Sequence, residues 1–312
     1  MRRPDFFIVG APKCGTTALY EYLRRHPDLF LPETKELRFF GADLEVRSFK
    51  DRELDEYMRF FTHATNNQRI GTAYVWYLYS KTAAAEISRF APGASIIVML
   101  RQPADMLYSL HSEHLSNGNE DLSSFEEALA AEPDRRAGKR IPPHAHLPQG
   151  LLYSQIPRYT DQIRRYFSAF GRDHVHVILY DDFAKDTATS YRNTLRFLGV
   201  RDDIAPQFEV INPNKRVRSE TVRHFLARPP QVSRRIIRAT VPARIRQALF
   251  VRAKRLNVTT PQRPALSDVT REYINGQFRA EVGQLGELLE HDLRHWVEPS
   301  AVPQTVVSGE GP

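Results

Sequence analysis

The sequence has few cysteines and no long apolar run. Its 312 residues include a single Cys, which excludes an intrachain disulfide and any metal site built from several thiolates. No uninterrupted apolar stretch approaches the roughly 20 residues that are needed to cross a bilayer. The first strand-like segment begins shortly after Met1, which leaves no room for a secretory signal peptide. We therefore expect a cytoplasmic protein that contains no metal site.

One long segment is almost without acidic residues. Residues 212–255 contain thirteen Lys or Arg side chains and one acid, Glu220, in a chain whose net charge is +7. Such an asymmetry predicts an anionic partner, and a solvated basic surface is the alternative. Residues 229–256 mix Arg with apolar side chains, which favours peripheral contact with an anionic membrane at its inner face. A basic lid over a bound nucleotide is the competing interpretation.

Apolar runs alternate with amphipathic stretches, an order typical of an α/β fold with helices on both faces of a parallel sheet. We predict buried strands at 6–9, 95–100 and 175–180, in a P-loop-like arrangement. The absence of repeats and linkers predicts a single domain over 1–299, followed by a disordered tail at 300–312. The expected helices are 16–25, 53–61, 83–90, 103–114, 153–167, 187–198 and 268–293, with short helices in 228–265, a mobile basic loop at 133–150 and mostly loops in 28–70.

The loop after the first predicted strand lacks lysine at the Walker A position. Gly10 and Gly15 have the Walker spacing, but Thr16 occupies the position of the Walker lysine and Lys13 lies in the middle of the loop. Free backbone N–H groups and a helix N-terminus at this point can hold a phosphate-like group. We therefore predict a phosphate-binding loop that differs from the Walker A loop.

A basic residue follows the second predicted strand. Arg101 comes directly after residues 95–100, and Ser109 follows within the next predicted helix. Ligands bind at the carboxyl ends of parallel strands in α/β folds, and an Arg fork with a hydroxyl suits a second, separate phosphate. An Arg that only caps neighbouring carbonyl groups is the alternative.

The predicted strands lack the terminal Asp that would hold Mg²⁺ in a P-loop NTPase. The strand at 175–180 is nevertheless followed by Asp181 and Asp182. A P-loop kinase or NTPase that uses Lys13 and Mg-ATP therefore remains an alternative.

Glu36 is the candidate general base. It lies among apolar side chains in the segment 35–40, and partial desolvation there would favour a base. A surface Glu paired with Lys35 or Arg38 is the alternative. His111 and His114 share a helix face, but two histidines without a third ligand make a weak metal site, and packing is the alternative role of each.

These segments together resemble sulfotransferases that use 3′-phosphoadenosine 5′-phosphosulfate (PAPS). Residues 7–19 resemble the loop for the donor's 5′-phosphosulfate, and residues 96–109 resemble the motif for its 3′-phosphate. Segment 35–40 is similar to the one that carries the catalytic Glu of glycan sulfotransferases, such as the heparan sulfate enzymes. Supporting similarities lie at 150–153, 179–183, 197–199 and 288–296, so that the resemblance runs from about Phe6 to Trp296.

The resemblance implies in-line transfer of a sulfuryl group from PAPS to an acceptor hydroxyl without a metal, leaving adenosine 3′,5′-bisphosphate (PAP). It implies that Lys13 stabilises charge on the bridging oxygen and that Glu36 takes the acceptor's proton. His114 or His111 is the alternative base, as in phenol-type members. The implied donor-binding residues are Pro12, Lys13, Cys14, Gly15, Thr16, Thr17, Ala18, Arg101, Ser109, Lys215, Arg216 and Arg218.

The acceptor is expected to be a small molecule, a carbohydrate or a glycolipid. Ala73 departs from the family pattern, because many glycan-type members carry a Lys near the acceptor there. This difference weighs against a glycosaminoglycan-like acceptor. The aromatic residues at 74, 76, 77 and 79 either line an acceptor pocket or bury a core face. A nucleic-acid binder that uses the basic stretch is a further alternative, but it gives no role to Arg101 with Ser109, and we expect no nucleic-acid partner.

Overall fold

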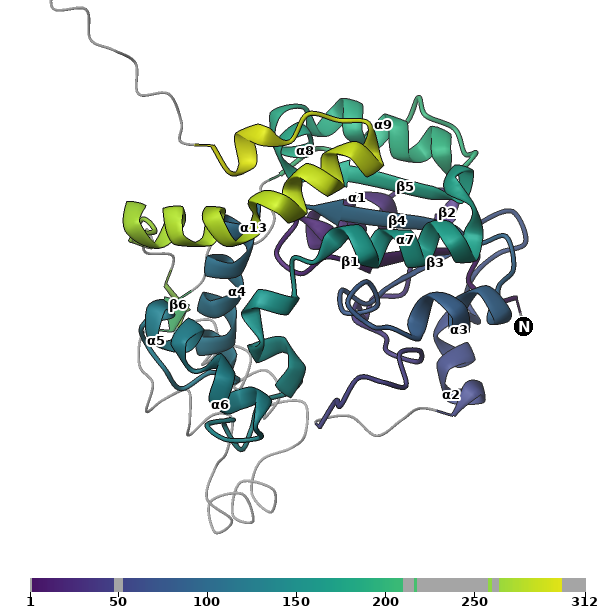
Figure 1. Ribbon diagram of the computed structural model, residues 1–312. Helices are drawn as coiled ribbons and strands as arrows, with labels where there is room; N and C mark the ends of the chain where they lie inside the picture. Colours follow the sequence, from purple (N-terminus) through teal and green to yellow (C-terminus); the bar gives the residue numbers. More distant parts are fainter. Residues whose placement is uncertain (1, 48–52, 210–215, 218–257, 260–263, 299–312) are drawn as a thin grey trace, which may run out of the picture.

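The structure is a computed structural model that describes residues 2–47, 53–209, 216–217, 258–259 and 264–298 (Figure 1). Several predictions lie outside these residues. They are the donor-binding roles of Lys215 and Arg218, the short helices within 228–265, the membrane contact of 229–256 and the tail at 300–312. The backbone of Arg216 is described as part of the short strand β6 (Arg216–Val217), which pairs with β7 (Val258–Thr259).

A five-stranded parallel sheet forms the centre of the molecule (Figure 1). Its strands are β1 (Phe6–Gly10), β2 (Leu29–Phe30), β3 (Arg69–Ala73), β4 (Ser95–Leu100) and β5 (Val175–Leu179), in the order β2-β3-β1-β4-β5. Every residue of β1 and β4 is buried. Continuous apolar strands require cover on both faces, and the helices supply it.

Helices α3 and α7 lie in front of the sheet in Figure 1, and α1 lies behind it. The helices are α1 (Thr16–Arg24), α2 (Leu54–Met58), α3 (Ala83–Phe90), α4 (Pro103–Asn117), α5 (Phe125–Ala130), α6 (Glu132–Arg136), α7 (Tyr159–Phe170), α8 (Tyr180–Lys185), α9 (Thr187–Phe197) and α13 (Asp268–Leu289). Helix α13 packs against both α4 and α7. The predicted α/β class with helices on both faces is therefore confirmed. Within the described residues no helix is long and apolar enough to cross a membrane.

Two local predictions need correction, and a third is confirmed. The described part of 28–70 is mostly loop, as expected, and its regular elements are β2, α2, a 3-10 turn at Arg59–Phe61 and the start of β3. The loop expected at 133–150 holds most of α6 and a 3-10 turn at Pro148–Leu151. The helix expected from Tyr153 begins at Tyr159 and is preceded by a 3-10 turn at Tyr153–Gln155, because Pro157 has no N–H to donate back to Tyr153 O in a continuous α-helix.

A buried ion pair fixes the region around α6. Arg135 donates to Glu120 Oε1 at 2.7 Å, and both side chains are fully buried. Tyr153 also donates to Glu120, at 3.1 Å, and the Arg135 guanidinium contacts the carbonyl oxygens of Ala128 and Leu151. A buried charge pair is tolerated when further hydrogen bonds satisfy its atoms. This network joins the segment after α4, which carries Glu120, to α6 and to the 3-10 turn that begins at Tyr153.

Gly71 in β3 makes room for an aromatic ring. It is the register partner of Phe6, and a Cβ atom at Gly71 would lie 2.0 Å from Phe6 Cζ. We expect Gly71→Ala to lower the free energy of unfolding by at least about 1–3 kcal/mol, the usual cost of overpacking. Gly276→Ala in α13 is the matched control, because its Cβ would contact nothing within 4 Å and Ala favours a helix by roughly 0.5–1 kcal/mol. Urea denaturation measures both variants, and equal midpoints would contradict this account of β3.

Candidate active site

The loop between β1 and α1 exposes an uncapped helix N-terminus. Lys13 (φ 62°) and Gly15 (φ 90°) have left-handed backbones, and Gly15 caps α1 without a side-chain hydrogen bond. The first N–H groups of a helix without a side-chain cap are free for an anion. Ala11 N donates to Met99 O at 2.7 Å, which fixes the loop beside β4. The local structure therefore agrees with the predicted phosphate-binding loop.

Lys13 forms an ion pair that the sequence did not reveal. Its Nζ contacts Glu113 Oε2 on α4. Partial burial raises the pKa of Glu113, but the attraction of Lys13 outweighs this effect and the pKa lies below its ordinary value. Glu113 lies four residues after Ser109, and hence on the same helix face. The i, i+4 spacing of Ser109 and Glu113 is the sequence signal that could have indicated this contact.

Arg101 leaves the end of β4 and reaches back to the loop. Its Nη1 lies 3.5 Å from Lys13 O, and its guanidinium lies 4.5 Å from the centre of the Tyr180 ring. Asp105 Oδ2 is 3.7 Å from Arg101, and Asp105 Oδ1 accepts a 2.8 Å hydrogen bond from Arg271 of α13. Burial raises the pKa of Asp105, yet the bond from Arg271 and other contacts bring it below its ordinary value. Two guanidinium groups thus meet at Asp105, and the sequence predicted one of them.

Glu36 stands at the carboxyl end of β3. Val75 N donates to its Oε2 at 3.0 Å, and Lys35 Nζ contacts its Oε1. The side chain is 37% exposed, so that it is accessible. The predicted alternative, a Glu paired with Lys35, describes one of its two contacts. The backbone of Glu36 has φ 65°, and strained non-glycine residues of this kind gather at functional sites.

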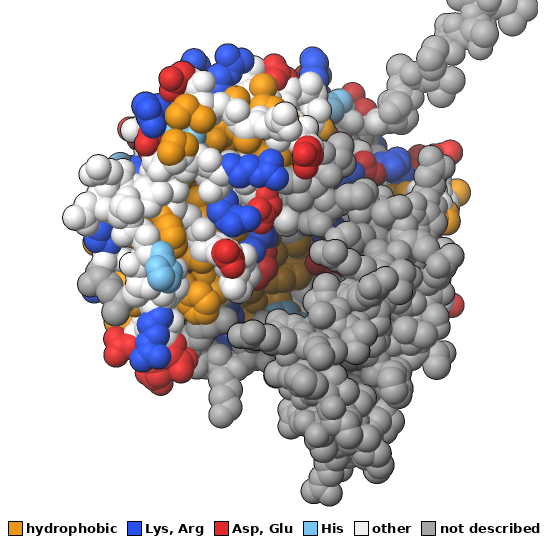
Figure 2. Space-filling model, turned by 180° about the vertical axis from the view of Figure 1, so that it is seen from behind, with side chains coloured by type: hydrophobic (Ala, Val, Ile, Leu, Met, Phe, Trp, Pro, Cys, Tyr) orange, Lys and Arg blue, Asp and Glu red, His pale blue; other side chains and the backbone are white. Residues whose placement is uncertain are grey.

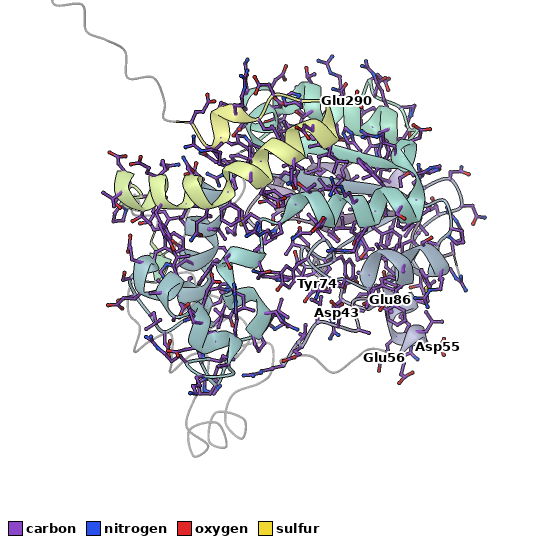
Figure 3. All side chains as sticks on the ribbon, in the orientation of Figure 1. Asp43, Asp55, Glu56, Tyr74, Glu86 and Glu290 are labelled. Atoms are coloured by element: carbon purple, nitrogen blue, oxygen red, sulfur yellow. The ribbon has the colours of Figure 1, made fainter. Side chains whose placement is uncertain are left out.

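The segment that carries Glu36 is anchored from both sides. Tyr77 Oη accepts a 2.8 Å hydrogen bond from Phe39 N and donates to Leu37 O at 3.1 Å. Further along, Glu86 on α3 accepts a 2.7 Å bond from Gly41 N. Figure 3 labels Glu86 and Asp43 on this side of the sheet. These contacts hold Glu36 rigidly relative to the sheet.

The two predicted histidines are buried. His114 Nε2 lies 3.2 Å from Gly150 O, its ring stacks on Trp76, and burial lowers its pKa to about 4. His111 Nε2 lies 2.9 Å from Leu122 O. Both rings join α4 to the segments that follow it, which favours the packing role. No cluster of three or more metal-ligating side chains occurs among the described residues.

A third histidine, His146, is affected by the charge of Glu36. Burial and the charge of Arg38 lower its pKa, while Glu36 raises it. Its carbonyl accepts a 2.9 Å bond from Arg47 N, and its own N–H donates to Asn119 Oδ1 at 3.0 Å. Sequence reasoning missed it because it lies in a loop without regular spacing.

The aromatic residues after β3 mainly build the core. Tyr74, Trp76 and Tyr77 are buried, whereas Tyr79 is partly exposed; Figure 3 labels Tyr74. The aromatic run therefore supports the sheet more than it lines a pocket.

Figure 2 shows basic and acidic side chains interleaved around a hollow on the rear face of the molecule.

The candidate residues meet at one edge of the sheet. Glu36 lies beside the end of β3, the loop with Lys13 follows β1, and Arg101 follows β4, and these strands are neighbours in the order β3-β1-β4. The carboxyl ends of parallel strands form this edge. A cation in an anion-binding loop, a second cation and a carboxylate can together bind a doubly phosphorylated ligand and accept a proton.

The chain matches the sulfotransferase domain family over residues 3–217. Human bifunctional heparan sulfate N-deacetylase/N-sulfotransferase 3 is 30% identical over 213 residues, which cover 64% of this chain and 22% of that protein. Human carbohydrate sulfotransferase 15 is 27% identical over 248 residues, which cover 63% of this chain and 44% of the relative. The matched regions thus span about a fifth and less than half of these two relatives.

A solved structure supports the same assignment along nearly the whole chain. The sulfotransferase from Alicyclobacillus acidocaldarius superposes with a TM-score of 0.71 at 27% identity, covering 96% of this chain and all of the other. The family match includes β1 to β5 and the three strand ends that carry the candidate residues. The chain therefore belongs to the sulfotransferase family and is a sulfotransferase enzyme.

Proposed function

We propose that this enzyme transfers the sulfuryl group of PAPS to a hydroxyl of a carbohydrate, glycolipid or small molecule, with Glu36 as general base and without a metal. The observation that carries the proposal is the meeting of Lys13, Arg101 and Glu36 at three adjacent strand ends. A loop for one anionic group, a separate cation for a second and a base are what this reaction requires.

The donor would lie along the β1–α1 loop. Backbone N–H groups from Cys14 onward and the hydroxyls of Thr16 and Thr17 suit the 5′-phosphate at the α1 N-terminus. Pro12 and Ala18 bound the loop. Arg101 and Ser109 suit the 3′-phosphate, and Lys215, Arg216 and Arg218 are proposed to close over the nucleotide. This assignment predicts weaker binding of ATP, because ATP offers no 3′-phosphate to Arg101 and Ser109.

In the reaction, the acceptor oxygen attacks sulfur while the bond from sulfur to the bridging oxygen breaks. The acceptor's proton passes to Glu36, and the electron pair of the broken bond remains on the bridging oxygen of PAP. Lys13 stabilises the charge that develops there, and this stabilisation is strongest in the transition state. The product is a sulfate ester, so that atoms and charge balance without an added cofactor.

The relatives' names favour a carbohydrate acceptor. One is named for heparan sulfate and another as a carbohydrate sulfotransferase. Ala73 lies at the end of β3, two residues before Val75, whose N–H binds Glu36. Its methyl side chain cannot replace the lysine that many glycan-type members carry there. We therefore propose a saccharide or glycolipid hydroxyl rather than a glycosaminoglycan.

The structure gives Asp181, one of the two aspartates of the kinase alternative, contacts within the protein. Asp181 Oδ2 accepts a 2.6 Å hydrogen bond from Trp296 Nε1 and lies 3.4 Å from His295 Nε2. These contacts tie α8 to the 3-10 turn at Arg294–Trp296, which is a structural role.

A transfer assay tests the proposal. The enzyme is incubated with radiolabelled PAPS and a panel of neutral saccharides, glycolipids, phenols and amino sugars, with and without EDTA. We expect label on a hydroxyl-bearing saccharide or glycolipid, at a rate that EDTA leaves unchanged. Label on amino sugars alone would replace the hydroxyl acceptor with an amine, and loss of transfer in EDTA would contradict the metal-free mechanism.

A further inference from the structure

Glu113 holds the ammonium group of Lys13 in an ion pair that the proposed chemistry does not use. Its carboxylate contacts the Lys13 ammonium, although the two residues are 100 positions apart in the chain. The Lys13 side chain is 29% exposed and the Glu113 side chain 44%, so that both are accessible from solvent. The proposed chemistry gives Glu113 no role, and packing does not require an exposed carboxylate at this point.

A second lysine also affects the pKa of Glu113. The positive charge of Lys35 lowers the pKa of Glu113, in addition to the larger effect of Lys13. Lys35 itself contacts Glu36. Lys13 with Glu113 and Lys35 with Glu36 are therefore two separate ion pairs, and the charge of Lys35 also acts on Glu113.

We propose that Glu113 is a positioning residue, the resting counter-ion of Lys13, which the donor displaces when it binds. This inference rests on the proposed function, because it requires that Lys13 contact the donor. In the empty site Glu113 holds the ammonium group over the loop. When the phosphosulfate attracts Lys13, the positive charge of Lys35 still acts on the Glu113 carboxylate.

Breaking the ion pair between Lys13 and Glu113 costs little free energy, but this cost opposes donor binding. A partly exposed ion pair contributes at most about 1 kcal/mol, which corresponds to roughly a fivefold change in affinity. Removal of the Glu113 charge should therefore strengthen nucleotide binding, whereas loss of an ordinary binding residue weakens it. The gain must disappear when Lys13 is absent, because Glu113 acts through Lys13.

Calorimetric titration with PAP tests this double-mutant cycle. We expect Glu113→Gln to lower the Kd for PAP roughly two- to fivefold. In a Lys13→Ala background the same substitution should leave the Kd unchanged. Glu113→Asp, which keeps the charge, and Glu127→Gln on the exposed face of α5 should stay near the wild-type value. Circular dichroism confirms that each variant is folded.

Three results would overturn the inference. One is a Glu113→Gln variant that binds PAP no better than wild type, and another is an equal gain in the Lys13→Ala background. In both cases PAP binding by the wild-type enzyme would leave the proposed function intact. Failure of wild-type enzyme to bind PAP at all would overturn the proposed function together with the inference.

Discussion

Replacement of Lys13 by alanine is expected to lower kcat by roughly 100- to 1,000-fold, the usual effect of losing one group that stabilises developing negative charge. Lys13 lies within the loop that precedes α1, and its ammonium contacts Glu113 of α4. Because the effect falls on the transition state, kcat and kcat/KM should decrease together. Single-turnover transfer from labelled PAPS measures it directly.

The fold should survive this substitution. The ion pair between Lys13 and Glu113 is partly exposed and contributes at most about 1 kcal/mol to stability. Lys185→Ala, at an exposed position on α8, is the matched control and should keep full activity. A Lys13→Ala enzyme that is folded by circular dichroism and retains wild-type kcat would remove Lys13 from the mechanism.

Replacement of Glu36 by glutamine is expected to lower kcat by roughly 100- to 10,000-fold, the range found for loss of a general base. Glutamine keeps the shape of the side chain and can still accept the hydrogen bond from Val75 N, but it cannot take a proton. The binding of PAP should therefore remain unchanged while turnover falls. Steady-state kinetics with a saccharide acceptor, together with PAP titration, separates these two effects.

Glu33→Gln is the control for this substitution, because Glu33 is exposed three residues earlier in the same segment. It should behave as wild type. If Glu36→Gln retained full activity, the base would be another group, and His146 would be the next candidate because its pKa responds to the charge of Glu36. The buried His114, with its pKa lowered to about 4 and its ring held by Gly150, is less suited to that role.

The sequence was most informative where a strand consists of consecutive apolar residues. Residues 95–100 predicted β4 with its observed bounds, because a strand covered on both faces needs an apolar side chain at nearly every position. Strand β3 has no such run. Its sequence Arg-Ile-Gly-Thr-Ala is buried through pairing with β1 and through the fit of Phe6 over Gly71, and neither feature is visible locally.

The site shows the same division between local and distant information. The positions of Lys13, Arg101 and Glu36 followed from glycine spacing, a strand end and an apolar segment, all of which are local patterns. The pairs Lys13–Glu113 and Asp105–Arg271 join residues 100 and 166 positions apart, and no local pattern specifies such a contact. The histidines of α4 were ambiguous because helix spacing does not show which face of a helix is buried.

Calorimetric titration with PAP, set against ATP with Mg²⁺, is the measurement that tests the central claim most directly. The account predicts micromolar binding of PAP and little binding of ATP–Mg²⁺. It also predicts that Arg101→Ala weakens PAP binding by roughly 10- to 100-fold, as expected for loss of a hydrogen-bonded charge. Binding of ATP–Mg²⁺ alone, with no response to PAP, would contradict the assignment of Lys13 and Arg101 to a phosphosulfate donor.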